Sequence, residues 1–288
     1  MSRIAGEGCE TLVPFNERKP LNEIERSIVK TYRKNIWSKF IKAIKDYNLL
    51  EEGDKVAVAI SGGKDSLLMA KLFQELQRHG QFKFNLEFIA MDPGYHPDIK
   101  QLLIDNCEYL NIPVHIFESG IFDIADRMAK DYPCYLCARM RRGALYSKAQ
   151  ELGCNKLALG HHFNDVIETT LLNVLYSGNF KTMLPKLKST NFKGLELIRP
   201  LYYVEELHIQ RFTQNSGIWP LNCACMVAAK KIGNKRYEIK DLIEQMKKNF
   251  ENVDKSIFKA AQNVNMDAIL GWEKDGEKHS YLDFYDEE

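Results

Sequence analysis

The sequence predicts an α/β fold built on a doubly wound parallel sheet, with a helical segment before the sheet and a smaller helical region after it. Short β-rich apolar segments alternate with segments of helical periodicity between residues 55 and 175, as in parallel strands joined by helices. The first strand leads directly into a glycine loop and a helix. With 288 residues, 45% of them hydrophobic, the chain can bury a sizeable core.

The N-terminal part is predicted to be an irregular arm followed by helices. Residues 1–20 mix glycine, proline and charge, whereas residues 21–47 carry apolar side chains at helical spacing (Ile24, Ile28, Tyr32, Ile36, Phe40 and Ile44). This spacing predicts one or two amphipathic helices. We interpret the basic residues among them, Arg26, Lys30, Arg33 and Lys34, as a solvated helix face in preference to an RNA contact.

The elements of the sheet follow in order along the chain. Strands are predicted at 55–60, 84–91, 114–117 and 156–160, and helices at 67–73, 99–110, 138–152 and 165–175. Such an alternation implies a parallel sheet that is covered on both faces. After residue 200 the character changes, and we expect a looser helical region with helices near 205–214, 240–249 and 255–263.

Composition sets the cellular context that we expect. The 40 basic and 39 acidic residues nearly cancel, so that any RNA-binding surface must be local. No signal-like start and no run of about 20 apolar residues is present, which favours a cytoplasmic protein without a membrane segment. Four of the seven cysteines form two close pairs, and in a reducing compartment these suggest metal or redox chemistry in preference to disulfides.

The loop Ser61-Gly62-Gly63-Lys64-Asp65-Ser66 is the strongest functional signal. Two glycines let backbone amides approach an anion, and the next helix adds its N-terminal dipole. Lys64 supplies positive charge, and the hydroxyls of Ser61 and Ser66 can donate to phosphate oxygens. Asp65 either holds Mg²⁺ or caps the helix. The loop matches neither the P-loop motif of phosphate-transferring enzymes nor the glycine pattern of dinucleotide folds. A simple turn is the alternative.

The pair Cys134-Tyr-Leu-Cys137 can direct two thiolates to one metal centre if it lies in a loop or at a helix start. The spacing alone leaves a redox dithiol, a zinc site and an iron–sulfur cluster open. Cys107 and Cys154 lie among apolar residues of predicted helices, and we interpret them as small buried hydrophobic residues.

Several further motifs occur in a characteristic order. They are Cys134 to Gly143, Leu159-Gly160-His161-His162-Phe-Asn164-Asp165, Leu175 to Gly178, Met183 to Leu187 and Ile198 to Leu201. Together with the Ser-Gly-Gly-Lys-Asp-Ser loop, this segment, about residues 37–200, resembles the tRNA 2-thiocytidine synthetase branch of the PP-loop ATP pyrophosphatase family. The resemblance implies an N-terminal arm and helices at 1–50, a PP-loop domain at 51–203 and a helical region at 204–288.

The resemblance also implies a [4Fe–4S] cluster that is held by three cysteines and leaves one iron open to carry sulfur. Cys134 and Cys137 would supply two ligands, and the third would come from Asn222-Cys223-Ala224-Cys225. Family members typically carry Cys-x-x-Cys there, so that both Cys223 and Cys225 stay candidates. The implied partners are ATP, Mg²⁺, a tRNA substrate and a sulfur donor, either a cysteine desulfurase or sulfide, with a homodimer as an additional possibility.

Site residues are assigned by the same resemblance. Asp165 follows a strand at the carboxyl edge of the sheet and is the expected catalytic carboxylate, although it could only cap its helix. Lys64 and Arg141 complete the catalytic candidates, while Gly160 and His161 join the phosphate loop as nucleotide-binding candidates. Asp92 is expected near the adenosine, or else is a turn residue before Pro93. Asn164 stands where a member often has a second aspartate.

Basic residues near these motifs are candidates for RNA contacts, with a solvated surface as the alternative. They are Arg139, Arg141 and Arg142 after the first cysteine pair, and Lys181, Lys186 and Lys188 around the Leu-Pro-Lys segment.

The resulting hypothesis is ATP-dependent thiolation of a tRNA cytidine, in which the base carbonyl oxygen is adenylated and then replaced by sulfur. Three alternatives stay open at this point. The same apparatus could thiolate a uridine, the chain could be an amide-forming PP-loop ligase without a cluster, or it could be a non-catalytic cluster or redox sensor.

Overall fold

The computed structural model describes residues 17–80, 82–119, 133–221 and 235–285, with the backbone alone for 133–138. Six strands form the main sheet in the order β3-β2-β1-β4-β6-β5. They are β1 (Lys55–Ala59), β2 (Asn85–Asp92), β3 (Val114–Glu118), β4 (Lys156–Ala158), β5 (Lys186–Lys188) and β6 (Glu196–Ile198). All neighbours are parallel except β5 and β6, which pair antiparallel.

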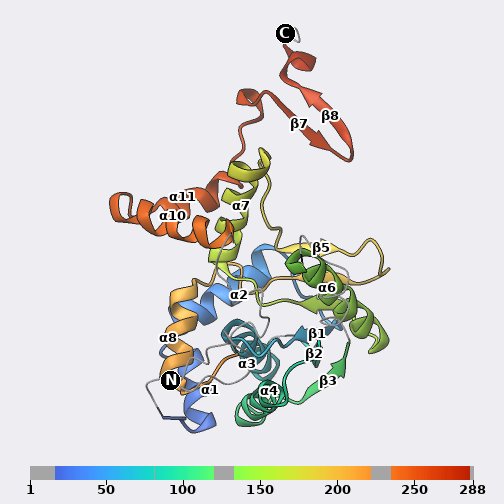
Figure 1. Cartoon of the computed structure of the whole chain (residues 1–288), viewed down its shortest axis with the longest axis vertical. Helices are drawn as coiled ribbons and strands as arrows, with labels where there is room; N and C mark the ends of the chain where they lie inside the picture. The colour runs from blue at the N-terminus through green and yellow to red at the C-terminus, as the bar shows by residue number, and fades with distance from the viewer. Residues whose placement is uncertain (1–16, 81, 120–132, 222–234, 286–288) are drawn as a thin grey trace.

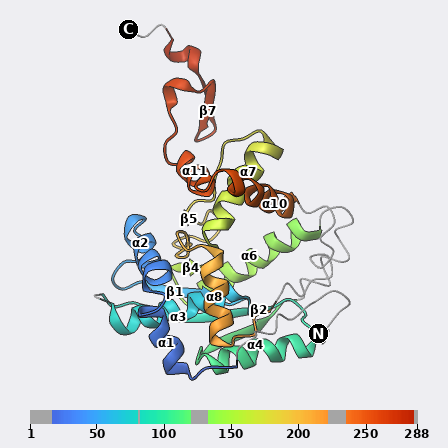
Figure 2. The same cartoon turned by 90° about the vertical axis from the view of Figure 1, so that its left-hand side faces the viewer.

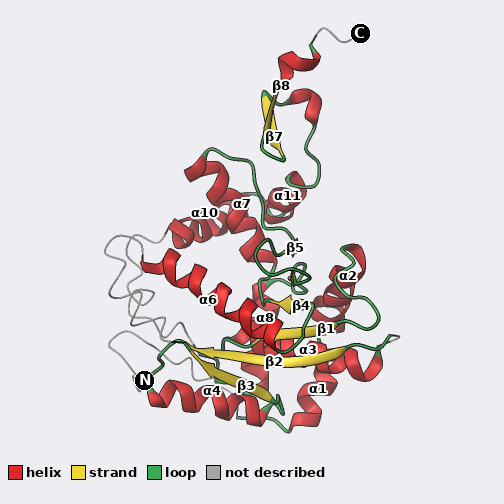
Figure 3. Cartoon of the chain, turned by 90° about the vertical axis from the view of Figure 1, so that its right-hand side faces the viewer, coloured by secondary structure: helices red, strands yellow, loops and turns green. Residues whose placement is uncertain are grey.

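Helices cover both faces of this sheet, which confirms the predicted doubly wound α/β fold (Figure 3). The helices of this layered body are α3 (Lys64–His79), α4 (Pro97–Tyr109), α6 (Pro133–Glu151), α7 (Phe163–Ser177) and α8 (Glu206–Ser216). Side chains of β1 point alternately to the two faces of the sheet. Val56 and Val58 lie in the larger core with α3 and α4. Ala57 and Ala59 face Tyr146 of α6 in the smaller core.

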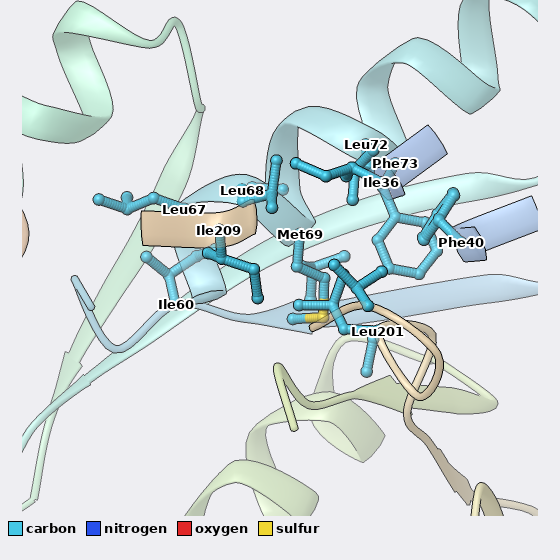
Figure 4. Close-up of a cluster of buried hydrophobic side chains, with 14 of the residues drawn as sticks. Ile36, Phe40, Ile60, Leu67, Leu68, Met69, Leu72, Phe73, Leu201 and Ile209 are labelled. Atoms are coloured by element: carbon cyan, nitrogen blue, oxygen red, sulfur yellow. The ribbon is translucent and has the colours of Figure 1, made fainter. Parts of the chain in front are cut away.

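The N-terminal layer consists of α1 (Leu21–Val29), a π-helical turn η1 (Arg33–Trp37) and α2 (Ser38–Asp46). All six apolar residues that predicted this layer are buried, none being more than 8% exposed. Figure 4 shows Ile36 and Phe40 beside Leu72 and Phe73 of α3, and the Phe40 and Phe73 rings meet edge to face with centroids 5.6 Å apart. The layer therefore closes the larger core.

The C-terminal region is helical only in part. The helices α10 (Lys235–Asn249) and α11 (Val253–Ala260) pack beside α7, as Figures 1 and 2 show. A short 3₁₀ turn η2 (Met266–Ala268) then leads into the hairpin of β7 (Gly271–Lys274) and β8 (Glu277–Ser280), followed by η3 (Tyr281–Phe284). The sequence expectation missed this hairpin, which projects from the body (Figure 1). No helix among the described residues is both long and apolar enough to cross a membrane.

Candidate active site

The phosphate loop joins β1 to α3 and is shaped by its own glycines and serines. Gly62 has φ +78°, a conformation that favours glycine, and a Cβ atom there would lie 2.5 Å from Cδ1 of Leu221. The Ser66 hydroxyl donates to the Gly63 carbonyl oxygen (2.9 Å), and Ser61 Oγ donates to Ser66 Oγ (3.1 Å). These hydrogen bonds fix the conformation of the loop at the N-terminus of α3, where the backbone amides of the helix attract an anion.

Lys64 is the cation of this loop. Its Nζ lies 3.1 Å from Asp65 Oδ2 and 3.1 Å from Glu206 Oε1. Burial alone would lower the pKa of Lys64, but these two carboxylates outweigh burial and raise it. The lysine is therefore charged at neutral pH and held between the carboxylates of Asp65 and Glu206.

A cavity of about 300 Å³ opens at the carboxyl ends of β1 and β4. Its walls bring together predicted site residues from four segments: Ser61, Asp65, Ser66, Arg141, Gly160, His161 and Asp165. Apolar walls come from Met91, Leu145 and Leu159, with Tyr95 beside them. In open α/β sheets this edge is where ligands bind. A larger hollow of about 440 Å³ between α1 and the end of α8 is lined by none of the catalytic or nucleotide-binding candidates.

Gly160 allows the two loops of the cavity to approach each other. A Cβ atom at this position would lie 3.3 Å from the carbonyl carbon of Asp65 and 3.3 Å from the amide nitrogen of Ser66. A side chain here would therefore push the end of β4 away from the phosphate loop. Packing against the phosphate loop therefore explains why residue 160 is a glycine, whether or not it contacts a ligand.

Asp165 caps α7 and also faces the cavity. One carboxylate oxygen, Oδ2, accepts a hydrogen bond from the His162 amide at 3.0 Å, while Oδ1 lies 3.0 Å from a guanidinium nitrogen of Arg236. The His162 ring bridges Asp165 and Asp65, with nitrogen–oxygen distances of 3.5 and 3.7 Å. Burial opposes ionisation, but the two histidines, the amide and Arg236 together lower the pKa of Asp165. The carboxylate is thus ionised at neutral pH.

Two more titratable groups near Asp165 are strongly perturbed. Burial lowers the pKa of His161 to about 4, so that its ring is neutral at pH 7. Its Nδ1 is buried without a hydrogen-bond partner in the described part of the chain. Burial, followed by the charge of Asp165, raises the pKa of Glu168 to about 7. Such opposed pKa shifts around one carboxylate, here Asp165, are typical of functional sites.

Asp92 ends β2 but does not line the cavity. Its Oδ1 accepts hydrogen bonds from the amides of Gly94 (3.0 Å) and Tyr95 (2.8 Å), and its Oδ2 lies 3.0 Å from Nζ of Lys100. These contacts shape the turn that carries Tyr95 to the cavity wall. The contact between Asp92 and adenosine stays a prediction, alongside this turn-forming role.

The four cysteines of the close pairs lie outside the residues whose side chains are described, but described residues near each pair contact the cavity or the phosphate loop. Cys134 and Cys137 belong to the start of α6, and the same helix brings Arg141 to the cavity. The segment with Cys223 and Cys225 follows Leu221, whose amide donates to the Gly62 carbonyl at 2.9 Å. No group of three metal-binding side chains occurs among the described residues.

Cys107 and Cys154 are buried, as predicted. Burial raises the pKa of Cys107 to about 12 and that of Cys154 to about 11. Both thiols are therefore protonated at neutral pH, whereas a metal ligand must be a thiolate.

Basic candidates for RNA contacts have different surroundings. Arg139, Arg142, Lys181 and Lys188 are exposed. Lys186 instead lies 3.1 Å from Glu196 and donates to the Asn48 carbonyl at 2.9 Å, so that it connects the edge of the sheet to the segment that follows α2. This geometry favours a structural role for Lys186.

Sequence reasoning missed four charged residues around the site. Glu206 contacts Lys64, and its second oxygen lies 2.7 Å from Nζ of Lys240. Arg236 contacts Asp165, and the buried Arg199 donates to the Leu184 carbonyl. Burial lowers the pKa of Arg199 to about 10. Arg236 and Lys240 are one turn apart on α10, and only the tertiary fold brings them to Asp165 and Glu206.

Asn164 occupies the position where a second carboxylate was considered. Its Oδ1 accepts a hydrogen bond from the backbone amide of Glu206 at 3.0 Å and so fixes the start of α8. This contact gives Asn164 a structural role in placing Glu206 beside Lys64.

Comparison with known proteins places this geometry in context. Residues 22–220 match the family model of the PP-loop domain. A Geobacter metallireducens protein named tRNA-cytidine(32) 2-sulfurtransferase is 36% identical over 244 residues, covering 84% of this chain and 93% of that protein. A protein of the same name from Paraburkholderia xenovorans is 35% identical over 270 residues, covering 90% and 78%. Among solved structures, the U34-tRNA thiolase NcsA from Methanococcus maripaludis with its [4Fe-4S] cluster superposes with a TM-score of 0.62 at 25% identity, covering 78% of this chain and 76% of that one.

Proposed function

The chain belongs to the PP-loop family, in the branch of the tRNA-cytidine(32) 2-sulfurtransferases, and from this premise we propose that it converts a tRNA cytidine to 2-thiocytidine at the expense of ATP. The observation that carries the proposal is the cavity that Asp65 and Ser66 of the phosphate loop line together with Asp165. Arg141, which shares α6 with the first cysteine pair, lines the same cavity, and Leu221, just before the second pair, contacts the phosphate loop. The names of the relatives favour cytidine 32 as the target. Uridine is the alternative, because NcsA is a U34 thiolase.

ATP is proposed to lie with its phosphates at the N-terminus of α3, on Lys64 and the amides of Gly62 and Gly63. Asp65 is the proposed ligand of Mg²⁺, because its Oδ1 is buried at the cavity without a hydrogen-bond partner in the described residues. The cation would neutralise the phosphates during the transfer.

The reaction consists of two substitutions. The 2-carbonyl oxygen of cytidine attacks the α-phosphorus and releases pyrophosphate, which gives an O-adenylated base. A sulfur nucleophile then adds to C2, the ring carbon that carries the adenylated oxygen, and AMP leaves with that oxygen. Asp165, whose pKa is lowered, stays ionised and is therefore suited to orient a donor such as the exocyclic amine.

The donor set fits a [4Fe–4S] cluster in chemical terms. Cys107 and Cys154 are protonated core residues and are therefore unsuited to bind a metal. The proposed ligands, which the family resemblance favours, are Cys134, Cys137 and one of Cys223 and Cys225. When bound, a cluster with three cysteine ligands would supply an open iron site for sulfur. The tRNA and the sulfur donor, a desulfurase or sulfide, are the proposed partners. A homodimer is a further proposal.

Metal analysis of anaerobically purified protein tests the cluster. We expect about four irons and four sulfides per chain, together with visible absorption. Cys134→Ala and Cys137→Ala should lose the iron, and one of Cys223→Ala and Cys225→Ala should lose it as well. Cys154→Ala is the matched control and should keep it. Zinc, or no metal after anaerobic reconstitution, would contradict the cluster and favour an amide-forming ligase.

A further inference from the structure

Glu206 bridges two lysines that are far apart in the sequence, Lys64 and Lys240. Its Oε1 lies 3.1 Å from Nζ of Lys64 in the phosphate loop, and its Oε2 lies 2.7 Å from Nζ of Lys240 on α10. The Glu206 side chain is only 15% exposed, so that both ion pairs are partly shielded from water. One carboxylate is thus shared between a phosphate-binding cation and a second cation that lies outside the loop.

The backbone of Glu206 is fixed independently of either lysine. It begins α8, and its amide donates to Asn164 Oδ1 at 3.0 Å. The N-terminus of a helix favours a negative charge. Burial opposes ionisation, but Lys240 and Lys64 outweigh it and lower the pKa of Glu206 to about 2. The residue is therefore a permanent anion whose side chain can change partner without moving its helix.

This anion lies where a triphosphate would have to bind. Lys64 has two carboxylate neighbours, Asp65 and Glu206, and both would repel phosphate oxygens that approach its ammonium group. Asp65 can be compensated by the Mg²⁺ that accompanies ATP. Glu206 needs a different partner, and Lys240 already contacts its other oxygen.

We propose that Glu206 is an exchangeable counter-ion: ATP phosphates replace it on Lys64, and Lys240 retains it, so that Lys240 acts on ATP binding through Glu206. The inference rests on the proposed binding of ATP at the loop. In this proposal each ion pair of Glu206 has its own role. The pair with Lys64 orients that lysine before ATP binds, and the pair with Lys240 holds the Glu206 carboxylate after ATP has displaced it.

Equilibrium binding of α,β-methylene ATP to the full-length protein tests the exchange, because this analogue cannot be cleaved between its α and β phosphorus atoms. Calorimetry at fixed Mg²⁺ would compare wild type, Glu206→Gln, Lys240→Ala and the double variant. We expect Glu206→Gln to bind about fivefold more tightly and Lys240→Ala about fivefold more weakly. In the Glu206→Gln background, Lys240→Ala should change affinity by less than about twofold.

The exposed Lys248 lies farther along α10, so that Lys248→Ala serves as the matched control, and thermal melting verifies that each variant is folded. Unchanged or weaker binding by folded Glu206→Gln would overturn the exchange. An undiminished loss from Lys240→Ala in the Glu206→Gln background would overturn it too, because Lys240 would then hold phosphate directly. If wild type itself does not bind the analogue, the proposed function fails with it; either other result leaves that function standing.

Discussion

At the residue scale, the site depends on charged groups whose neighbours come from distant parts of the chain. The phosphate loop and Asp165 could be predicted from sequence, because each follows a recognisable strand and lies at the start of a helix. Glu206, Arg236 and Lys240 could not, since their helices show ordinary surface charge patterns in the sequence. What makes them part of the site is the packing of α8 and α10 against α7 and the loop.

Glu168 gives a prediction about stability and pH. The pKa of this acid is raised to about 7 in the folded chain from the ordinary 4.5, so that the folded state binds more protons than the unfolded state between these values. Its contribution to stability is therefore lost as pH rises from 4.5 to 7. Glu168→Gln should remove this loss and gain on the order of 3 kcal/mol relative to wild type over that interval.

Urea denaturation of Glu168→Gln and wild type at pH 4.5, 6 and 8 measures this difference. Glu244→Gln is the matched control, because Glu244 is an exposed glutamate of α10. A stability difference between Glu168→Gln and wild type that does not change with pH would show that Glu168 titrates normally.

Arg236 gives a prediction about activity. It contacts Asp165 at 3.0 Å and Glu168 at 3.6 Å, and it donates to the Thr169 hydroxyl at 3.4 Å. Arg236→Ala would remove a cation that keeps Asp165 ionised and in place. We expect kcat to fall at least about tenfold with the iron content unchanged, and Arg236→Lys to recover part of it. Steady-state kinetics and iron analysis test this, and full activity of Arg236→Ala would contradict it.

At the element scale, the N-terminal layer could be predicted because its apolar residues keep a strict spacing, and the structure buries all of them. The edge strand β5 and its neighbour β6 could not, since Lys186–Lys188 and Glu196–Ile198 are short and lack the longer apolar run that marks β4 in the sequence. The sequence does contain one signal of the hairpin of β7 and β8, the dipeptide Asp275-Gly276 between the two strands. Both residues have positive φ, as a tight two-residue hairpin turn requires.

Lys71 gives a prediction at the junction of α1 and α3. Its fully buried ammonium group contacts Glu25 at 2.6 Å and donates to the Leu110 carbonyl at 3.0 Å. Breaking such a pair by Glu25→Ala leaves a buried charge and should cost about 2 kcal/mol or more. Lys71→Met fills the same space without a charge and should cost less, because Glu25 keeps Arg78 at 2.8 Å. Chemical denaturation decides, and the reverse order would contradict this account.

At the scale of the whole molecule, the chain consists of a layered α/β body with the site at the carboxyl edge of its sheet, and a hairpin that projects beyond α11 (Figure 1). The body could be predicted, because alternating strands and helices allow few arrangements. How the C-terminal helices pack against α7 could not, since that depends on contacts between residues far apart in sequence, such as Tyr176 with Glu238 at 2.5 Å.

The projecting hairpin gives a prediction about stability. Within the described residues, its strands pair with each other and Trp272 stacks on His279 and Phe284, all inside the tail. Truncation after Leu270 should therefore change the melting temperature of the body by no more than about 2 °C. Differential scanning calorimetry measures it, and a larger loss would show that the tail stabilises the body.

The most direct test of the central claim is to incubate the anaerobically reconstituted enzyme with unmodified tRNA, ATP, Mg²⁺ and sulfide, and to analyse the digested nucleosides by mass spectrometry. We predict that wild type forms 2-thiocytidine, with AMP and pyrophosphate in equal amounts. Lys64→Ala should form none of these three products. Cys134→Ala should bind ATP but form no thionucleoside. A thiolated uridine in place of 2-thiocytidine, ADP in place of AMP, or full thiolation by Cys134→Ala would contradict the account.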